Sequence, residues 1–122
     1  MTKIAITSEG PTLEDALDPR FGRAAGFVIV DPQTMEHRYV ENGRAQTMAQ
    51  GAGIQAAETV VTAGAKIVLT GFVGPKAYMA LSAAGIQVGQ NLENMTVRDA
   101  IERYRQGTVD WAEAPNRQGH GR

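Results

Sequence analysis

The stretch from Ile67 to Val88, IVLTGFVGPKAYMALSAAGIQV, most constrains the fold. Three apolar residues followed by two glycines predict a buried strand that ends in a tight turn. Pro75 predicts the start of a helix, because proline at the first helical position has its φ already set and lacks only an N–H that would be unpaired there. Gly85 predicts the end of that helix, before a second short strand. A strand-helix-strand unit of this kind indicates parallel strands, so the fold class we expect is α/β.

The first half of the chain predicts antiparallel strands instead. Residues 3–7 alternate as a strand, with Ile4 and Ile6 on one face. Residues 26–31 predict a buried strand, and the turn residues at 31–34 predict that residues 35–41 pair back with it as a hairpin.

Two further helices are predicted, each ended by a glycine. One follows a flexible loop over residues 42–53 and ends at Gly64; its apolar stripe consists of Ile54, Ala57 and Val61. The other begins at Thr96, which forms a capping-box pattern with Asp99, and ends at Gly107. We therefore expect a sheet with helices packed on it.

Length and composition exclude several classes of protein. The chain has 122 residues, 43% hydrophobic and 20% charged, with a formal net charge of −1 and no cysteine. These values predict one domain, over residues 1–111, and they favour neither nucleic acid nor membrane as a partner. Residues 112–122 show no apolar periodicity, so we expect them to form a flexible tail. Disulfides and thiolate ligands are excluded. Because no signal segment or long apolar run is present, we expect a cytoplasmic protein.

One edge of the predicted sheet gathers glycines and positive charges. Ligands of open α/β sheets bind outside the carboxyl ends of the strands. That edge would collect residues 8–10, 42–53 and 71–76, with residues 20–23 close by; Arg20, Arg23, Arg44 and Lys76 supply positive charge. Such a pocket suits an anion, which the free N–H groups at the start of the helix would also favour. Gly71, Gly74 and Lys76 are also typical of a tight strand-to-helix turn with a solvated lysine.

The candidate binding residues share these loops. They are Ser8, Arg20, Phe21, Gly22, Arg23, Asn42, Met48, Gly51, Gly53, Gly71, Gly74, Pro75 and Lys76. Ser8 has no obvious base nearby and the chain has few carboxylates at strand ends, so we expect a binding protein rather than an enzyme. Met48 and His37 are weak alternatives as direct metal ligands.

The order of several motifs resembles a known family. The motifs are KIAIT, RFGRA followed by FVIVD, the Asn-Gly and GAG loop, TGFVGPKA with LSAAGI after it, and TVRDAIERYRQG, which together span about residues 3 to 108. They resemble the dinitrogenase iron-molybdenum cofactor biosynthesis family, which includes nitrogenase cofactor carriers and the orange protein of sulfate-reducing bacteria. The resemblance implies a ribonuclease-H-like α/β fold with a mixed five-stranded sheet.

The resemblance also implies a function. Family members bind a molybdenum-containing metal-sulfur cluster without covalent attachment, and the cluster of the orange protein is a mixed molybdenum-copper sulfide. We favour this type over an iron-molybdenum cofactor, with protein partners in delivery as a further expectation. Some cofactor carriers have a histidine before the Phe-Gly pair, where this chain has Arg20. An imidazole ligand is thus excluded there, whereas an arginine could hold an anionic sulfide cluster by its charge and N–H donors.

Two classes of function remain open from the sequence. The first is storage or delivery of the anionic cluster. The alternative is a module that binds a phosphate-bearing small molecule or a partner protein without catalysis. A nuclease, which the fold alone would suggest, is weaker because the carboxylates it needs are absent.

Overall fold

The computed structural model describes residues 2–46, 48 and 50–115, without the side chain of Arg44. Within these residues the strands and helices alternate along the second half of the chain. Their bounds are β1 Ile4–Ser8, β2 Gly26–Val30, β3 His37–Glu41, α1 Gly43–Gln46, α2 Ala52–Thr62, β4 Ile67–Leu69, α3 Pro75–Ala83, β5 Gln87–Gln90, α4 Val97–Gln106 and β6 Asp110–Trp111.

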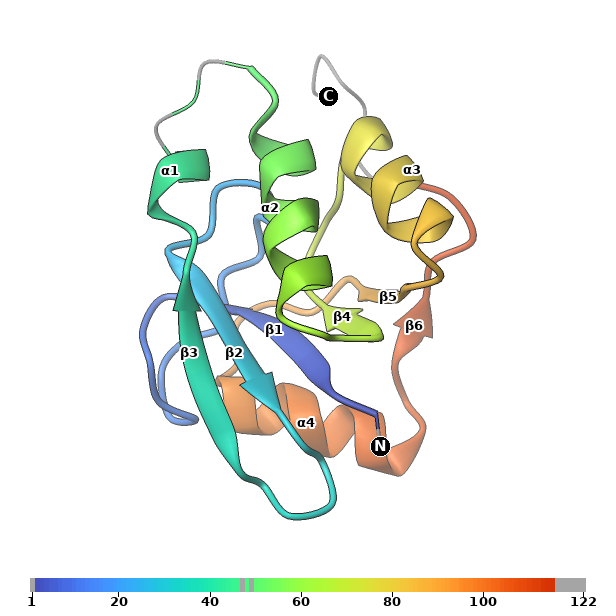
Figure 1. Ribbon diagram of the computed structural model, residues 1–122. Helices are drawn as coiled ribbons and strands as arrows, with labels where there is room; N and C mark the ends of the chain where they lie inside the picture. The colour runs from blue at the N-terminus through green and yellow to red at the C-terminus, as the bar shows by residue number, and fades with distance from the viewer. Residues whose placement is uncertain (1, 47, 49, 116–122) are drawn as a thin grey trace.

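The six strands form one mixed sheet in the order β3-β2-β1-β4-β5-β6 (Figure 1). The central strands β1, β4 and β5 are parallel, as the stretch from Ile67 to Val88 predicts. The hairpin of β2 and β3 is antiparallel, and β2 also pairs antiparallel with β1. The expected α/β class with a mixed sheet is therefore confirmed.

Helices cover both faces of the sheet. Figure 1 shows α2 and α3 side by side over one face, while α4 lies on the other. Successive residues of β1 divide between two cores accordingly: Ala5 packs in the core that includes Val60 and Leu81, whereas Ile4 and Ile6 pack with residues of α4. The alternation of the first strand and the shared face of Ile4 and Ile6 are confirmed.

Three details differ from the sequence-based expectation. The sheet has six strands rather than five, because β6 pairs antiparallel with β5. A strand of two residues carries no alternating pattern that a sequence could reveal. Within the predicted loop 42–53, residues 43–46 form the single turn α1, whose Ala45 is fully buried.

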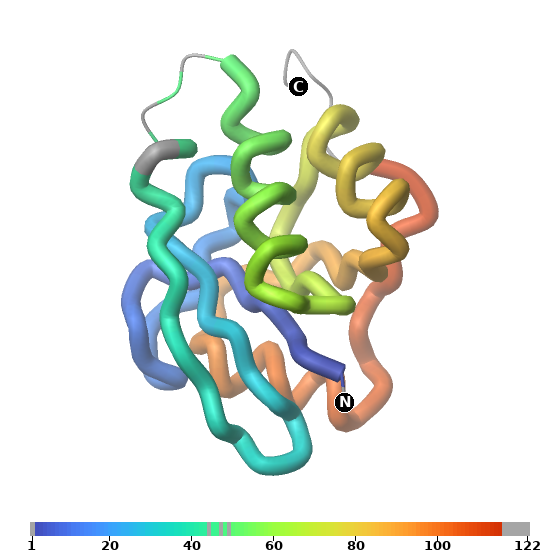
Figure 2. Tube along the Cα trace, in the orientation of Figure 1, coloured from blue at the N-terminus to red at the C-terminus, as the bar shows by residue number. Residues whose placement is uncertain are grey.

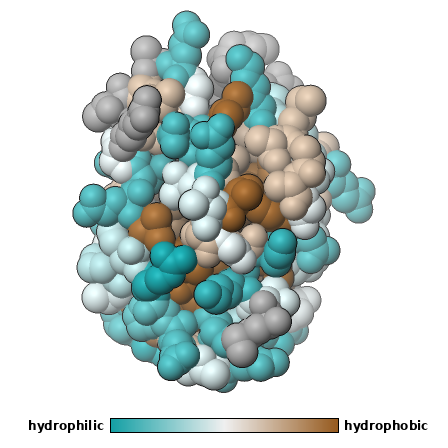
Figure 3. Space-filling view, viewed as in Figure 1, coloured by the Kyte–Doolittle hydropathy of each residue, from teal (hydrophilic) through white to brown (hydrophobic). Residues whose placement is uncertain are grey.

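The third difference concerns the buried face of α2. Ile54 and Val61 are 39% and 45% exposed, and only Ala57 of the predicted stripe is buried. The buried residues of α2 are Ala52, Ala56, Ala57 and Val60. Small residues face the core because α2 packs closely against α3, and apolar side chains of both helices contribute to the surface in Figure 3. Apolar periodicity therefore indicated the helix but not which face is buried.

The ends of the chain segments otherwise follow the predicted signals. Gly64, Gly85 and Gly107 adopt positive φ after their helices, and Thr96 forms the capping box with Asp99. Beyond β6, the Ala112 N–H donates to the Val88 carbonyl. Residues 116–122 of the predicted tail lie outside the described part of the chain.

Candidate functional site

A pocket of about 580 Å³ lies where α2 and α3 begin. In the view of Figure 1 both helices start at the top, beyond the carboxyl ends of the parallel strands β1 and β4. The lining residues come from three segments: Arg20, Phe21, Gly22, Arg23, Gln50, Gly51, Ala52, Gly53, Phe72, Gly74, Pro75, Lys76 and Ala77. Nine of the thirteen predicted binding residues are among them.

Both helices present first-turn backbone N–H groups at this pocket, and these have no side-chain acceptor among the described residues. The N-cap residues are Gly51 for α2 and Gly74 for α3, and neither has a side chain that could accept a hydrogen bond from the first turn. Neither first turn contains an acidic residue. The free N–H groups and the positive ends of two helix dipoles are therefore available to an anion.

The glycines of the pocket have different structural roles. A Cβ built on Gly53 would lie 2.9 Å from the Ala77 Cβ, and one on Gly22 would lie 3.2 Å from the Gly53 backbone. These two glycines let the arginine-containing loop and the first turns of α2 and α3 approach one another. Gly74 differs, because a Cβ there would meet nothing within 4 Å and its φ of −77° suits any residue. The space beside Gly74 is open for a ligand.

Gly71 contributes to packing outside the pocket. A Cβ on Gly71 would lie 2.5 Å from the Pro19 Cβ, so a side chain is excluded there. The Phe72 N–H donates to the Pro19 carbonyl (2.8 Å), and the Phe21 N–H donates to the Phe72 carbonyl (3.3 Å). Gly71 thus allows the loop of residues 18–23 to lie against the β4–α3 turn.

Arg20 is paired with an acid that the sequence-based site omitted. Its Nε and Nη2 atoms donate to the two carboxylate oxygens of Asp18, each at 3.1 Å. Asp18 is only 2% exposed, whereas the Arg20 side chain is 56% exposed. The hydrogen bond and charge of Asp18 raise the pKa of Arg20 above its ordinary value. The guanidinium is therefore charged and fixed in orientation, but its charge is balanced.

The other two cations of the pocket are less neutralised. Arg23 donates through Nη1 to the carbonyl oxygens of Gln46 and Met48, which are neutral acceptors. Lys76 is exposed and has no hydrogen-bond or ion-pair partner among the described residues. The net positive charge of the pocket consequently comes from Arg23, Lys76 and the two helix ends.

Four predicted residues lie outside the pocket lining: Ser8, Asn42, Met48 and Gly71. Ser8 is fully buried and its hydroxyl donates to the Gly10 carbonyl. Asn42 is 3% exposed, and its Nδ2 donates to the carbonyl oxygens of Gly22 and Ala24, which fixes the arginine-containing loop. Met48 is partly buried and lies beside Gly51.

His37, the other weak metal candidate, lies at the far end of the sheet. It pairs with Val30 in the β2–β3 hairpin, whose turn is opposite the first turns of α2 and α3 in Figure 2. Its Nδ1 atom contacts the Met35 carbonyl at 3.0 Å. His37 and the pocket therefore form no common site. Within the described part of the chain, no three histidine or acidic side chains are grouped to hold a metal ion.

Sequence reasoning missed the N-terminus of α2 as part of the site. Gly51 was a predicted binding residue, but only as part of a flexible loop. The pocket is also lined by residues that were not among the predicted binding residues: Gln50, Ala52, Phe72 and Ala77. Three of them, Gln50, Ala52 and Phe72, lie in the segments 42–53 and 71–76 that the sequence placed at this edge, whereas Ala77 lies just beyond.

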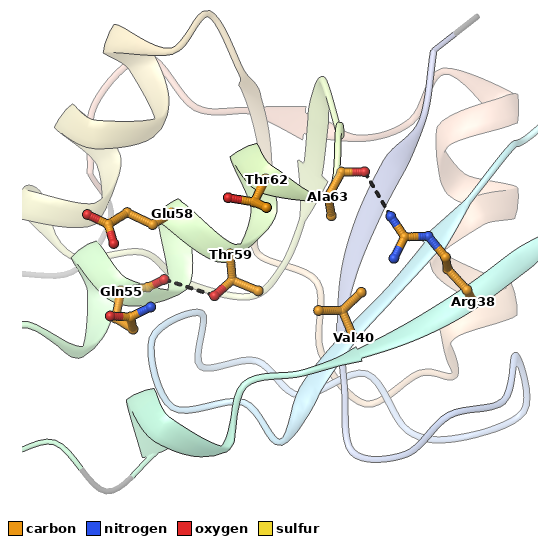
Figure 4. A pocket seen from close by; sticks show the side chains of 7 residues that line it. All are labelled: Arg38, Val40, Gln55, Glu58, Thr59, Thr62 and Ala63. Atoms are coloured by element: carbon orange, nitrogen blue, oxygen red, sulfur yellow. Dashed lines mark hydrogen bonds between the residues drawn. The ribbon is translucent and has the colours of Figure 1, made fainter.

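A second hollow lies between β3 and α2. Its volume is about 330 Å³, and its lining includes one positive and one negative side chain, Arg38 and Glu58 (Figure 4). Arg38 points across the hollow and donates to the Ala63 carbonyl at the end of α2. None of the predicted binding residues lines it, and the arginine is already used to hold the hairpin against the helix.

Comparison with known proteins identifies the family. The model for the family described as dinitrogenase iron-molybdenum cofactor matches residues 2–107. The chain belongs to the dinitrogenase iron-molybdenum cofactor family. This confirms the resemblance drawn from the motifs, and it links the protein to cofactor binding. The fold of this chain is also similar to solved structures of related proteins.

Three relatives illustrate the similarity. The apo form of the orange protein from Desulfovibrio gigas is 56% identical, with a TM-score of 0.93 over 96% of this chain and 98% of that chain. A Thermotoga protein solved by NMR is 32% identical, with a TM-score of 0.78 over 90% and 92% of the two chains. An uncharacterized protein of Methanocaldococcus jannaschii is 25% identical over 112 residues, which are 90% of this chain and 91% of its own length.

No helix in ranges 2–46 and 50–115 is both long and apolar enough to cross a bilayer.

Proposed function

We propose that this member of the dinitrogenase iron-molybdenum cofactor family binds an anionic molybdenum-containing metal-sulfur cluster and stores or delivers it in the cytoplasm, without catalysing a reaction. The family match and the similarity to the orange protein support cofactor binding. The 56% identity to the orange protein supports a molybdenum-copper sulfide over an iron-molybdenum cofactor. Delivery would require protein partners that supply or receive the cluster.

The observation that carries the proposal is the convergence of two uncapped helix N-termini on one pocket. Gly51 and Gly74 leave the first-turn N–H groups of α2 and α3 without side-chain acceptors. Lys76 and Arg23 add positive charge to the same pocket. Such an arrangement binds anions through backbone donors and charge, without requiring a thiolate.

The lining favours a large anion with spread charge over a compact one. A volume of about 580 Å³ exceeds what a single phosphate group fills, and Phe72, Pro75 and Ala77 contribute apolar surface beside the charges. Sulfide ligands are polarisable and are compatible with such mixed surroundings. Because a metal-sulfur cluster brings its own sulfides, the absence of cysteine is consistent with the proposal.

The Gly74→Val variant tests where the cluster binds. Its side chain would enter open space beside the α3 N-terminus without a backbone clash, so the fold should remain intact while the cluster is displaced. We expect the wild-type protein to become coloured with tetrathiomolybdate and copper, and folded Gly74→Val to remain colourless. Visible absorbance after gel filtration measures retention, and far-UV circular dichroism verifies folding.

The matched control is Gly43→Val. Gly43 also has open space for a Cβ, but it lies in α1 and does not line the pocket. This variant should retain the colour of the wild type. Full colour in folded Gly74→Val would place the site elsewhere. A wild-type protein that stays colourless and binds ATP instead would replace the cluster with a phosphate-bearing ligand.

A further inference from the structure

Asp18 is the buried acid beside the pocket, and within the described part of the chain all its side-chain hydrogen bonds involve Arg20. The carboxylate accepts from the Arg20 backbone N–H at 3.0 Å as well as from Nε and Nη2 at 3.1 Å each. A carboxylate that is 2% exposed requires such partners, because an unpaired buried charge is strongly unfavourable. The pair is therefore a fixed unit rather than a surface contact.

The backbone on both sides of Asp18 is anchored to the sheet edge. The Asp18 N–H donates to the Thr7 carbonyl at 3.0 Å, and the Thr7 hydroxyl donates to the Asp18 carbonyl. The next residue, Pro19, accepts from the Phe72 N–H. Asp18 is thus held by β1 on one side and by the β4–α3 turn on the other, so that its carboxylate is a rigid support for the guanidinium.

The Asp18 carboxylate leaves one side of the Arg20 guanidinium available to a ligand. A guanidinium has five N–H donors in a plane, and Asp18 uses two of them, on Nε and Nη2. The remaining three, two on Nη1 and one on Nη2, face away from the carboxylate and have no partner among the described residues. Arg20 lines the pocket and is 56% exposed. Its free donors are therefore fixed in direction beside the proposed cluster site.

Resting on the function proposed above, we propose that Asp18 is a positioning residue for the cluster: it holds the Arg20 guanidinium in one orientation, so that the remaining N–H donors are fixed in direction for the sulfides. Arg20 then contributes hydrogen-bond geometry, and Arg23 and Lys76 contribute the net charge. The pocket consequently selects an anion with acceptor atoms that match the free side of the guanidinium, in addition to selecting for negative charge.

Charge and orientation predict opposite effects for Asp18→Asn. The change removes a negative charge next to the anion, so attraction by charge alone would tighten binding. It also replaces an acceptor oxygen with an NH₂ group that opposes Nη2 or Nε, so loss of orientation would weaken binding. We expect affinity for the cluster formed from tetrathiomolybdate and copper to fall about tenfold, the effect of losing one charged hydrogen bond.

Arg20→Lys is the second variant and is safer for folding. Lysine keeps a positive partner for the buried carboxylate but lacks the planar fork. Charge alone predicts unchanged affinity, whereas orientation predicts a decrease of about tenfold, as in Asp18→Asn. If Asp18→Asn does not fold, Arg20→Lys decides between the two accounts.

A further readout separates orientation from a general loop defect. In the wild-type apo protein, the ¹⁵N NMR signal of Arg20 Nε–H should be protected from exchange with water; in Asp18→Asn it should exchange much faster, while the amide signals of Phe21 and Phe72 stay in place. Shifts of these amides would instead indicate a displaced loop and would overturn the proposal.

The outcomes distinguish the two proposals. A wild-type protein that takes up no cluster overturns the proposed function and, with it, the role of Asp18. A wild-type protein that is coloured, together with equal or tighter binding by Asp18→Asn and unchanged binding by Arg20→Lys, overturns the role of Asp18 alone. Weaker binding by both variants, with the loop in place, supports it.

Discussion

The cations at the mouth of the pocket differ in what already neutralises them. Arg20 is paired with the buried carboxylate of Asp18, while Arg23 donates to backbone carbonyl oxygens. Lys76 has no partner among the residues that the structure describes. The sequence shows how many cations these loops carry. It does not show which partner each cation has, because that depends on the three-dimensional course of the loops. Lys76 is accordingly the residue whose charge is most available to an anion.

The side chains that carry charge should affect cluster binding more than those that could ligate metal. We expect Lys76→Ala and Arg20→Ala each to weaken binding of the cluster by about 1 to 3 kcal/mol, the range for a charged hydrogen bond. Met48→Leu and His37→Gln should change it by less than about 0.5 kcal/mol. The affinity of each variant is measured by titrating the protein with tetrathiomolybdate and copper and following the visible absorbance of the bound cluster.

The salt dependence of the same variants provides the control. Between about 0.05 and 0.5 M salt, screening shortens the range of charge attraction to a few ångström, so wild-type affinity should fall markedly and Lys76→Ala affinity should fall less. Loss of colour in Met48→Leu or His37→Gln, with affinity insensitive to salt, would mean that a protein atom bonds directly to the metal.

At the scale of elements, the site is the meeting point of two helix starts and one loop. The start of α3 was predictable from Pro75, which stands at its first position after Gly74. The start of α2 was not, because its N-cap Gly51 has no side chain that marks a helix start and is not followed by proline. The closeness of the two starts depends on Gly53 against Ala77, a contact between residues far apart in the sequence. Local signals therefore indicated the segments, while packing decided how they combine.

The β4–α3 turn provides a stability test of this packing. A Cβ on Gly71 would lie 2.5 Å from the Pro19 Cβ, so Gly71→Ala should push the arginine-containing loop away from the turn. We expect a loss of about 1 to 3 kcal/mol in the free energy of unfolding, typical of an overpacked site. Gly74→Ala, whose Cβ enters open space, should change it by less than about 0.5 kcal/mol. Urea denaturation compares the two variants, and equal stabilities would contradict the assigned contact.

At the scale of the whole molecule, the sequence predicted the architecture better than the site. Periodicity, the hairpin turn and the glycine helix ends indicated five strands and the three longer helices. The pattern could not indicate β6, whose two residues are positioned by pairing with Gly89 and Gln90 of β5. Nor could it place Ile54 and Val61 on the surface, since close packing of α2 against α3 selects small residues for the core.

Two truncations test where the domain ends. Removing residues 113–122 should leave the melting temperature within about 1 to 2 °C, because residues 113–115 are exposed and the sequence beyond shows no apolar pattern. Removing residues 110–122 should lower it by several degrees, because this change also deletes β6 and the hydrogen bond from Ala112 to Val88. Thermal unfolding followed by circular dichroism gives both values. A loss of several degrees in the shorter truncation would show that the domain extends past residue 112.

The central claim is that an anionic cluster binds at the joint N-termini of α2 and α3. Amide NMR spectra of the ¹⁵N-labelled protein, recorded while the cluster is formed from tetrathiomolybdate and copper, test it most directly. The account predicts that the largest changes fall on the amides of residues 51–54 and of Gly74, Lys76 and Ala77, with smaller changes in residues 20–23 and none around His37. Changes centred on the β2–β3 turn, or on the hollow between β3 and α2, would contradict it.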